Sequence, residues 1–227
     1  MAPRSKKNQI GEKYLKKFRE KGITILDPRN TYIGSDVQIS KGNIIYPNTF
    51  LNGKIKIGQQ NTLGPNLYIE GKVTIGTKNN IRYSHITNSK IGNGNEIGPY
   101  ARLRDNVVLG NNIKIGNFVE IKNSQIGNFT QIAHLSYIGD AKIGKYVNIG
   151  AGTITANYNS ATGKKSSTLI KDRASTGSNS VLVAPITVGE GALVAAGSVI
   201  TKTVPKNALA ITRPKQENKL NWIRKKN

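Results

Sequence analysis

The residues whose chemistry stands out lie between positions 104 and 137. His134 is one of only two histidines, and a neutral imidazole, with a pKa of about 6.5, accepts protons near neutral pH. Arg104 and Lys122 are cations 18 positions apart, and two cations held close together favour an anion between them. Glu120 and Tyr137 add a carboxylate and a phenol. This set predicts proton transfer beside an anion site, provided that the fold gathers the five side chains.

Simpler explanations exist for each of these residues taken singly. An isolated cation is most often solvated, and Glu120 alone would be explained as an ion-pair partner of Lys122. His85, the second histidine, has no matching cluster around it and receives no role. Two histidines cannot form a three-histidine zinc site and the chain has no cysteine, so a metal-dependent hydratase is disfavoured and no metal site is predicted.

A six-residue repeat of aliphatic residues is the main pattern in the chain. From Ile33 to Ile81 every sixth residue is aliphatic, and the spacing continues, with a few five-residue steps, as far as Ile200. The aliphatic residue is commonly followed by glycine, as in Ile115-Gly116, and glycine tolerates the backbone of a tight corner. Each hexad therefore predicts a short strand and a turn, with side chains alternating between inside and outside.

Hexads of this kind are typical of an all-β fold, the parallel β-helix. One hexad cannot bury its apolar side alone, and stacked neighbours supply the core. Three hexads make a triangular coil of about 18 residues, so the repeat predicts roughly nine coils, each about 4.8 Å above the last.

The coil length gives the positions of the chemical residues. Arg104 and Lys122 are expected to stack one coil apart on one face, and a single short hexad places Glu120 beneath Tyr137. His134 occupies the third place of its hexad, which faces outward. The repeat therefore predicts that acid, base, phenol and cations meet in one corner region.

Three regions are predicted along the chain. Residues 1–22 form a basic segment with an amphipathic helix around 9–20, residues 23–213 form the β-helix, and residues 214–227 form a basic arm. Within the β-helix, residues 156–169 interrupt the repeat with turn-forming residues and are expected to protrude as a loop.

The charge is strongly positive: 34 Lys and Arg residues stand against 12 Asp and Glu, which gives +22. Two explanations remain open, a lysine-rich bias in composition and an affinity for polyanions such as nucleic acid or a phosphate-bearing small molecule. Nucleic acid is the less favoured partner, because no basic helix or aromatic-stacking motif is present.

The sequence contains no run of the roughly 18 to 20 apolar residues that span a bilayer, and no signal peptide is recognised. The absence of cysteine excludes a disulfide scaffold. These observations predict a soluble, unsecreted, cytoplasmic protein without membrane partners.

Longer blocks of sequence resemble a known enzyme family. The blocks are IGPYARLR from Ile97, IGNFVEIK from Ile115, HLSYIGDAKIGKYVNIGAGTITANY from His134, GSNSVLVAP from Gly177 and ALAITRPKQ from Ala208. Between Gly22 and about Trp222 the chain resembles the acetyltransferase half of the bacterial bifunctional glucosamine-1-phosphate N-acetyltransferase/N-acetylglucosamine-1-phosphate uridyltransferase. The resemblance implies a homotrimer of left-handed β-helices that transfers acetyl from acetyl-CoA to the amine of glucosamine 1-phosphate, on the route to UDP-N-acetylglucosamine.

The same resemblance implies roles for individual residues. His134 resembles the general base, Arg104 and Lys122 resemble the pair that holds the sugar phosphate, and a backbone amide near Ala151 is placed to stabilise an oxyanion. The residues that match the acceptor site are Arg104, Glu120, Lys122, Tyr137 and Asn148. The residues that match acetyl-CoA contacts, some of them contributed by a neighbouring subunit, are Ala151, Asn157, Tyr158, Ser178, Ala196 and Arg213.

The chain also departs from the family. Asn157-Tyr158-Asn159-Ser160 stands where the family has Asn-Tyr-Asp-Gly, and the following loop is longer. The uridyltransferase half, with its Gly-rich loop and magnesium site, has no counterpart, so no nucleotide transfer is expected and that step is left to a separate uridyltransferase. Two other functions stay open: N-acetylation of another amino sugar or nucleotide sugar, and a catalytically silent β-helix scaffold.

Overall fold

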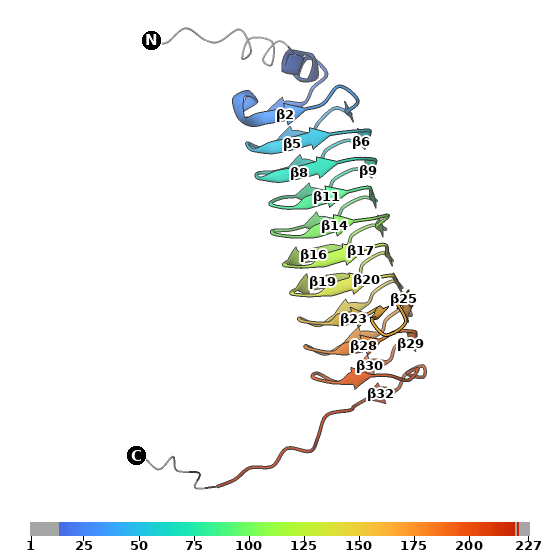
Figure 1. Ribbon diagram of the computed structural model, residues 1–227. Helices are drawn as coiled ribbons and strands as arrows, with labels where there is room; N and C mark the ends of the chain where they lie inside the picture. Colours follow the sequence, from blue (N-terminus) through green and yellow to red (C-terminus); the bar gives the residue numbers. More distant parts are fainter. Residues whose placement is uncertain (1–13, 221, 223–227) are drawn as a thin grey trace.

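The computed structural model describes residues 14–220 and 222, and it is a three-sided stack of short parallel strands (Figure 1). Each turn of the chain adds one strand to each side, so that three parallel sheets run along the molecule. Sheet 2, which has ten strands, faces the viewer in Figure 1, and the N-terminal helix lies at one end of the stack. The all-β parallel β-helix predicted from the hexads is therefore confirmed, and its left-handed winding stays a prediction.

The strands are short in all three sheets. Sheet 1 contains β1 (Thr24–Ile25), β4 (Ile44–Ile45), β7 (Thr62–Leu63), β10 (Asn80–Ile81), β13 (Glu96–Ile97), β16 (Lys114–Asn117), β19 (Gln131–His134), β22 (Asn148–Ile149), β27 (Ser175–Thr176), β30 (Leu193–Val194) and β32 (Leu209–Ala210). Sheet 2 contains β2 (Thr31–Ile33), β5 (Thr49–Asn52), β8 (Leu67–Glu70), β11 (His85–Thr87), β14 (Arg102–Arg104), β17 (Glu120–Lys122), β20 (Tyr137–Gly139), β23 (Ile154–Ala156), β28 (Val181–Val183) and β31 (Val199–Ile200). Sheet 3 contains β3 (Gln38–Ile39), β6 (Ile55–Ile57), β9 (Val73–Ile75), β12 (Lys90–Ile91), β15 (Val108–Leu109), β18 (Gln125–Ile126), β21 (Ala141–Ile143), β26 (Thr168–Ile170) and β29 (Ile186–Val188).

Aliphatic residues of successive coils pair directly with one another. Leu51 pairs with Ile33 in the coil before it and with Ile69, 18 residues further on, in the coil after it. Ile69 pairs with Ile86, a step of 17 residues, which is one of the short steps seen in the sequence. Sheet 2 has ten strands, so the stack has about ten coils, close to the roughly nine that the repeat predicts.

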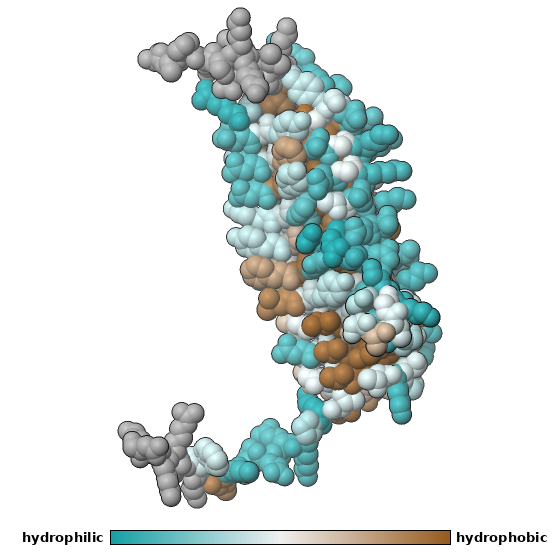
Figure 2. Space-filling view, viewed as in Figure 1, coloured by the Kyte–Doolittle hydropathy of each residue, from teal (hydrophilic) through white to brown (hydrophobic). Residues whose placement is uncertain are grey.

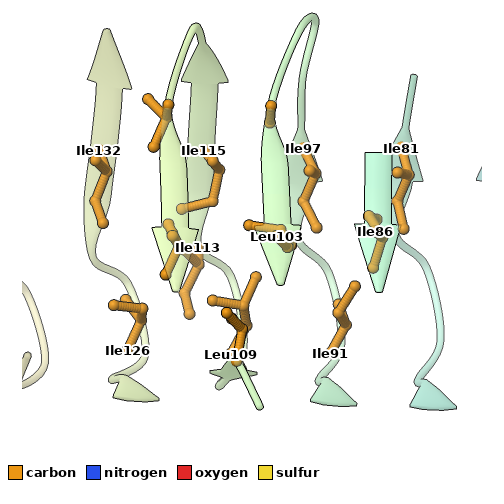
Figure 3. Packing of buried hydrophobic residues seen from close by; sticks show 14 of the residues in the cluster. Ile81, Ile86, Ile91, Ile97, Leu103, Leu109, Ile113, Ile115, Ile126 and Ile132 are labelled. Atoms are coloured by element: carbon orange, nitrogen blue, oxygen red, sulfur yellow. The ribbon is translucent and has the colours of Figure 1, made fainter. Parts of the chain in front are cut away.

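The interior is a continuous stack of aliphatic side chains (Figure 3). Figure 3 shows Ile97 and Ile115 from sheet 1 lying in one row and Leu109 and Ile126 from sheet 3 in another, while Leu103 of sheet 2 points into the same interior. All five are 3% exposed or less. Burying each such side chain contributes about 1.5–3 kcal/mol, and that contribution is available only when the neighbouring coils are in place.

Some of the glycines that follow aliphatic residues have a purpose beyond the one predicted. A β-carbon on Gly116 would lie 1.8 Å from the carbonyl oxygen of Ala133 in the next coil, and one on Gly58 would lie 2.4 Å from a carbonyl oxygen of its next coil. The left-handed backbone comes two residues later, for example at Phe118 with φ 56°. These two glycines are required because successive coils approach closely, whereas Gly64, with φ 89°, and Gly98, with φ 97°, follow aliphatic residues and do have the left-handed backbone of a tight corner.

A ladder of buried asparagines lines the corner between sheets 3 and 1. Its members, each 2% exposed or less, are Asn43, Asn61, Asn79 and Asn95. Asn79 Nδ2 donates to Asn61 Oδ1 at 2.9 Å and to the Gly92 carbonyl oxygen at 3.0 Å, while Asn79 Oδ1 accepts from the Asn95 amide at 2.8 Å. The ladder therefore satisfies backbone groups at a corner where strand pairing stops.

The ends of the described chain differ. Residues 14–20 are helical, and Leu15 and Phe18 are buried there while Tyr14 Oη donates to the Gly34 carbonyl oxygen at 2.9 Å. The first part of the predicted helix, 9–13, lies outside the described residues. A short 3₁₀ helix, η1 (Pro28–Asn30), precedes β2, and residues 214–220 are exposed. None of the described helices is long and apolar enough to cross a membrane.

We predict that Asn79→Ala destabilises the fold, because it leaves the Asn95 amide and the Gly92 carbonyl without their partners. The free energy of unfolding is expected to fall by about 2–4 kcal/mol. The adjacent Asn80, which is exposed on β10, supplies the control: Asn80→Ala is expected to change it by about 0.5 kcal/mol or less. Urea unfolding followed by circular dichroism measures both, and equal effects would contradict the role of the ladder.

Candidate active site

Arg104 and Lys122 lie side by side on the outer face of sheet 2, as the coil length predicts. They are direct partners in the pairing of β14 with β17. Arg104 Nη1 donates to Asp105 Oδ2 at 2.8 Å, and Lys122 Nζ lies 3.6 Å from the same oxygen. Arg104 Nε donates to Glu120 Oε1 at 2.6 Å. The two cations are therefore already paired with two carboxylates. We call Arg104, Lys122, Asp105 and Glu120 the cation cluster, although its net formal charge is zero.

This cluster is partly shielded from water. The side chain of Arg104 is 25% exposed and that of Lys122 is 21% exposed. The hydrogen bond to Glu120 raises the pKa of Arg104 above its ordinary value, and Asp105 adds to the shift. Arg104 therefore remains a cation over the whole pH range in which the protein is folded, and its charge is not a source of pH dependence.

Tyr137 lies in the next coil, with its ring over Gly139. β20 pairs Glu120 with Tyr137, as predicted, and Lys122 with Gly139. A β-carbon on Gly139 would lie 2.6 Å from Tyr137 Oη and 2.8 Å from Asn157 Nδ2. The missing side chain at Gly139 thus makes room for the phenol next to the lysine and for the amide of Asn157.

Asp140 holds Asn157 in this position. Asn157 is buried, at 8% exposure, and its Nδ2 donates to Asp140 Oδ2, while Asn123 Nδ2 donates to Asp140 Oδ1 at 2.5 Å. Tyr158, which follows Asn157, is 59% exposed. It begins the hairpin formed by β24 (Tyr158–Asn159) and β25 (Lys164–Lys165), which leaves the stack between β23 and β26 (Figure 1).

His134 lies at the corner between sheets 1 and 2. Its partner in the previous coil is Asn117, and His134 Nδ1 lies 2.7 Å from Asn117 Oδ1. An amide oxygen only accepts hydrogen bonds, so Nδ1 carries a proton in this arrangement, and in the neutral imidazole Nε2 then has the lone pair. The imidazole is exposed, and its accepting nitrogen is the one left for a ligand.

Residues predicted to contact acetyl-CoA continue the line of His134 along this corner. We call the line the corner column: Asn117, His134, Ala151, Ser178 and Ala196. Backbone bonds connect its coils, from the Gly152 amide to the His134 carbonyl at 3.3 Å and from the Gly197 amide to the Ser178 carbonyl at 2.8 Å. Arg213 Nη1 donates to the Ala196 carbonyl oxygen at 2.7 Å.

The corner column lies where the sheet 2 strands begin: two residues separate His134 from Tyr137, and Tyr137 pairs with Glu120 of the cation cluster. Asn157 and Tyr158 lie at the opposite edge of sheet 2, after β23. Asn148 is not brought to this face by the single chain. It is exposed on sheet 1, in register with Gln131 and Ser175.

Sequence reasoning missed Asp105, Asn117 and Asp140. All three hold a predicted site residue in place, and all three lie at corners, where the hexad pattern places polar residues facing outward. Asp105 directly follows Arg104, and this adjacency could have indicated an ion pair between them. Nothing in the spacing shows that Asn117 and Asp140 turn toward His134 and Asn157.

Neither of two hollows on sheet 3 includes a predicted site residue. One, of about 560 Å³, is lined by residues such as Val108, Lys142 and Leu169, and the other, of about 570 Å³, by Lys54, Lys56 and Lys72 among others. Among residues 14–220 and 222, no three His, Cys, Asp or Glu side chains are grouped as metal ligands. The site is therefore an open face and its adjoining corner.

Comparison with known proteins fits this geometry. Residues 88–123, which include all four side chains of the cation cluster, match the family "Bacterial transferase hexapeptide (six repeats)". The solved UDP-N-acetylglucosamine acyltransferase of Francisella novicida matches 82% of this chain and 68% of its own length, with a TM-score of 0.53 and 21% identity. The Arabidopsis enzyme of the same name matches with a TM-score of 0.52 and 20% identity, over 84% of this chain and 70% of its own length. At this identity the likeness supports the fold alone.

Curated relatives are much closer in sequence. The bifunctional protein GlmU of Pseudothermotoga lettingae is 51% identical over 209 residues, which is 92% of this chain and 46% of that protein. GlmU of Thermodesulfovibrio yellowstonii is 46% identical over 217 residues, 96% of this chain and 48% of that protein. By these matches the chain is similar to the hexapeptide-repeat transferases.

The chain matches the acetyltransferase half of GlmU, as its sequence blocks indicated. It spans about half the length of the curated relatives that it matches, and their other half has no counterpart among the 227 residues. The match extends over the coils that carry the cation cluster, the corner column and the hairpin.

We predict that Asn117 positions the imidazole of His134. Asn117→Ala is expected to lower kcat by about tenfold or more without changing the KM for the acyl donor, because Nδ1 loses its acceptor. Asn117→Asp puts a carboxylate beside the ring, which favours the protonated imidazole, so the acidic limb of the pH–rate profile is expected to move to higher pH.

Asn111→Ala is the matched control, since Asn111 is also an outward corner asparagine but bonds the Asn93 amide at another corner. Steady-state rates over a pH series decide between the outcomes. An unchanged pH profile in Asn117→Asp would count against the contact.

Proposed function

We propose that the chain N-acetylates glucosamine 1-phosphate with acetyl-CoA as the donor, and that His134 is the general base. The observation that carries the proposal is the position of an imidazole with an accepting Nε2 next to a face that holds paired cations. The relatedness to GlmU supports acetyl-CoA and the amino-sugar phosphate as the substrates.

In the proposed reaction the acceptor amine attacks the thioester carbonyl carbon. His134 Nε2 removes a proton from the amine, the C–N bond forms, and the C–S bond breaks to release the CoA thiolate, which takes up a proton. The Ala151 N–H, one coil along the corner column from His134, has no hydrogen-bond acceptor within the described chain. It is placed to stabilise the oxyanion of the tetrahedral intermediate.

Arg104 and Lys122 are proposed to hold the sugar phosphate. A guanidinium binds phosphate oxygens through two parallel N–H groups, and an ammonium adds a compact charge. Glu120 keeps the guanidinium oriented through Nε and adds a negative charge beside the acceptor. Tyr137 and Asn148 are proposed as further acceptor contacts, the second from a neighbouring subunit, because a single chain keeps Asn148 on another face.

The coenzyme is proposed to run along the corner column past Ala151, Ser178 and Ala196 to Arg213. Asn157 and Tyr158 are proposed to contact the coenzyme bound to the adjoining subunit, since they lie at the far edge of sheet 2. Bringing two bound reactants into line in this way makes their reaction effectively intramolecular.

A homotrimer is proposed as the assembly. Apolar side chains gather on the viewed face over β23 and β28 (Figure 2). Ile154 is 42% exposed, Val183 36% and Val199 50%, on the same face as the cation cluster. Exposed apolar surface of this kind marks an interface, and a neighbouring subunit would cover it while completing the site.

The first test is direct. Incubation with acetyl-CoA and glucosamine 1-phosphate is expected to release free CoA, measured by a thiol reagent, and to yield N-acetylglucosamine 1-phosphate, measured by mass spectrometry. His134→Ala is expected to lower kcat by about 10²- to 10⁴-fold and to leave the dissociation constant of acetyl-CoA unchanged. His85→Ala is the matched histidine control. Normal turnover by His134→Ala would remove the proposed base.

A second test concerns the acceptor. Amino sugars are compared with and without a 1-phosphate, and the phosphorylated sugar is expected to have the higher kcat/KM. Lys122→Met is expected to lower that kcat/KM by about tenfold to a hundredfold, because one charge-assisted contact is lost, and to leave the rate with unphosphorylated glucosamine unchanged. Equal rates on both sugars in the wild type would favour another amino sugar as the acceptor.

A further inference from the structure

Asp105 holds an unusual position between the two cations of the proposed phosphate site. Its Oδ2 contacts both Arg104 Nη1, at 2.8 Å, and Lys122 Nζ, at 3.6 Å. These are the same two groups that are proposed to bind the acceptor phosphate. A carboxylate oxygen therefore takes the place between the two cations.

The residues stacked on Asp105 in the neighbouring coils, at the corner between sheets 2 and 3, make different contacts. In the preceding coil, Asn88 Oδ1 accepts from the Lys72 backbone amide at 3.0 Å. In the following coil, Asn123 donates to Asp140. Among the described residues, Asn88 and Asn123 therefore form hydrogen bonds along the corner between sheets 2 and 3. Asp105 instead turns toward the outer face of sheet 2. Its orientation is thus set by the two cations rather than by the repeat.

The side chain of Asp105 also has room to leave. It is 48% exposed, about twice as much as the side chain of either cation. Its backbone is in the left-handed region, with φ 57°, as is that of Asn106, with φ 67°. A change of rotamer at this corner carries the carboxylate into water without moving a strand, and the bond from Arg104 Nε to Glu120 keeps the guanidinium in place.

From these contacts we propose that Asp105 is a competing internal anion that the acceptor phosphate displaces, so that this residue sets the affinity and preference for a phosphorylated acceptor. The proposal rests on the function proposed above and assigns a specificity-determining residue to it. A retained Asp105 would repel the entering dianion, because both would share the same two cations. An acceptor without phosphate does not displace Asp105, so Arg104 and Lys122 stay paired with its carboxylate.

The test measures phosphate binding directly, so that it does not depend on turnover. Inorganic phosphate is titrated into the wild-type protein and Asp105→Asn by calorimetry at fixed ionic strength. Asp105→Asn keeps the shape of the side chain but loses its charge, and it is expected to bind phosphate about tenfold more tightly. Asp105→Glu, which restores a carboxylate, is expected to return the affinity toward that of the wild type.

Asp36→Asn is the control for net charge. Asp36 is exposed in the first coil and forms no ion pair with another residue of the described chain, so its loss changes the overall charge equally without touching the site. Its phosphate affinity is expected to stay within about twofold of the wild type, since distant surface charges are screened by salt. Asp105→Ser is a second variant if Asp105→Asn does not fold.

Kinetics give an independent readout. Asp105→Asn is expected to lower the KM for glucosamine 1-phosphate by a larger factor than the KM for unphosphorylated glucosamine. Phosphate affinity that is equal or weaker in Asp105→Asn, or no measurable binding to either protein, overturns the proposal. Tighter phosphate binding without any acetyl transfer would support the role of Asp105 and reject the proposed function, whereas transfer with unchanged phosphate affinity would do the reverse.

Discussion

Residue-on-residue stacking of parallel coils is the constraint on which the rest of the structure depends. Each strand donates and accepts its backbone hydrogen bonds with the coils on either side, so that a residue always lies next to its equivalent in the neighbouring turns. The stacking brings Gly116 so close to Ala133 that no β-carbon fits. It also turns polar corner residues into ladders such as that of the buried asparagines.

The same constraint explains why the sequence predicted so much of the site. Once the aliphatic spacing gives the coil length, the partners of Arg104 and Glu120 follow by counting, and the observed register agrees. The interruption after Ala156 was equally visible, because its residues break the hexads. The predicted roles of the site residues stay predictions, since register gives their positions and not what they bind.

What the sequence did not predict lies in the choice of side-chain partners. Asp105 and Asn117 occupy outward corner places where many polar residues would fit, and the hexads do not distinguish a side chain that bonds the next corner from one that turns onto a sheet. Their partners depend on rotamers and on which charges lie nearby. The close approach of coils at Gly58 and Gly116 was missed for a related reason, because the space between coils is a property of the stack and not of the single hexad.

A strongly positive surface makes selectivity harder to achieve, not easier. With a formal charge of +22, anions are attracted to much of the molecule, so two more cations would not by themselves distinguish one anion from another. Glu120 and Asp105 change this, because they remove the net charge of the cluster and keep its hydrogen-bond geometry. A small diffuse anion gains little from a neutral cluster. A ligand gains binding free energy only if it replaces the Asp105 contacts with better ones and its remaining groups bind elsewhere on the face. The neutral cluster therefore favours a phosphate carried by a sugar over a free ion.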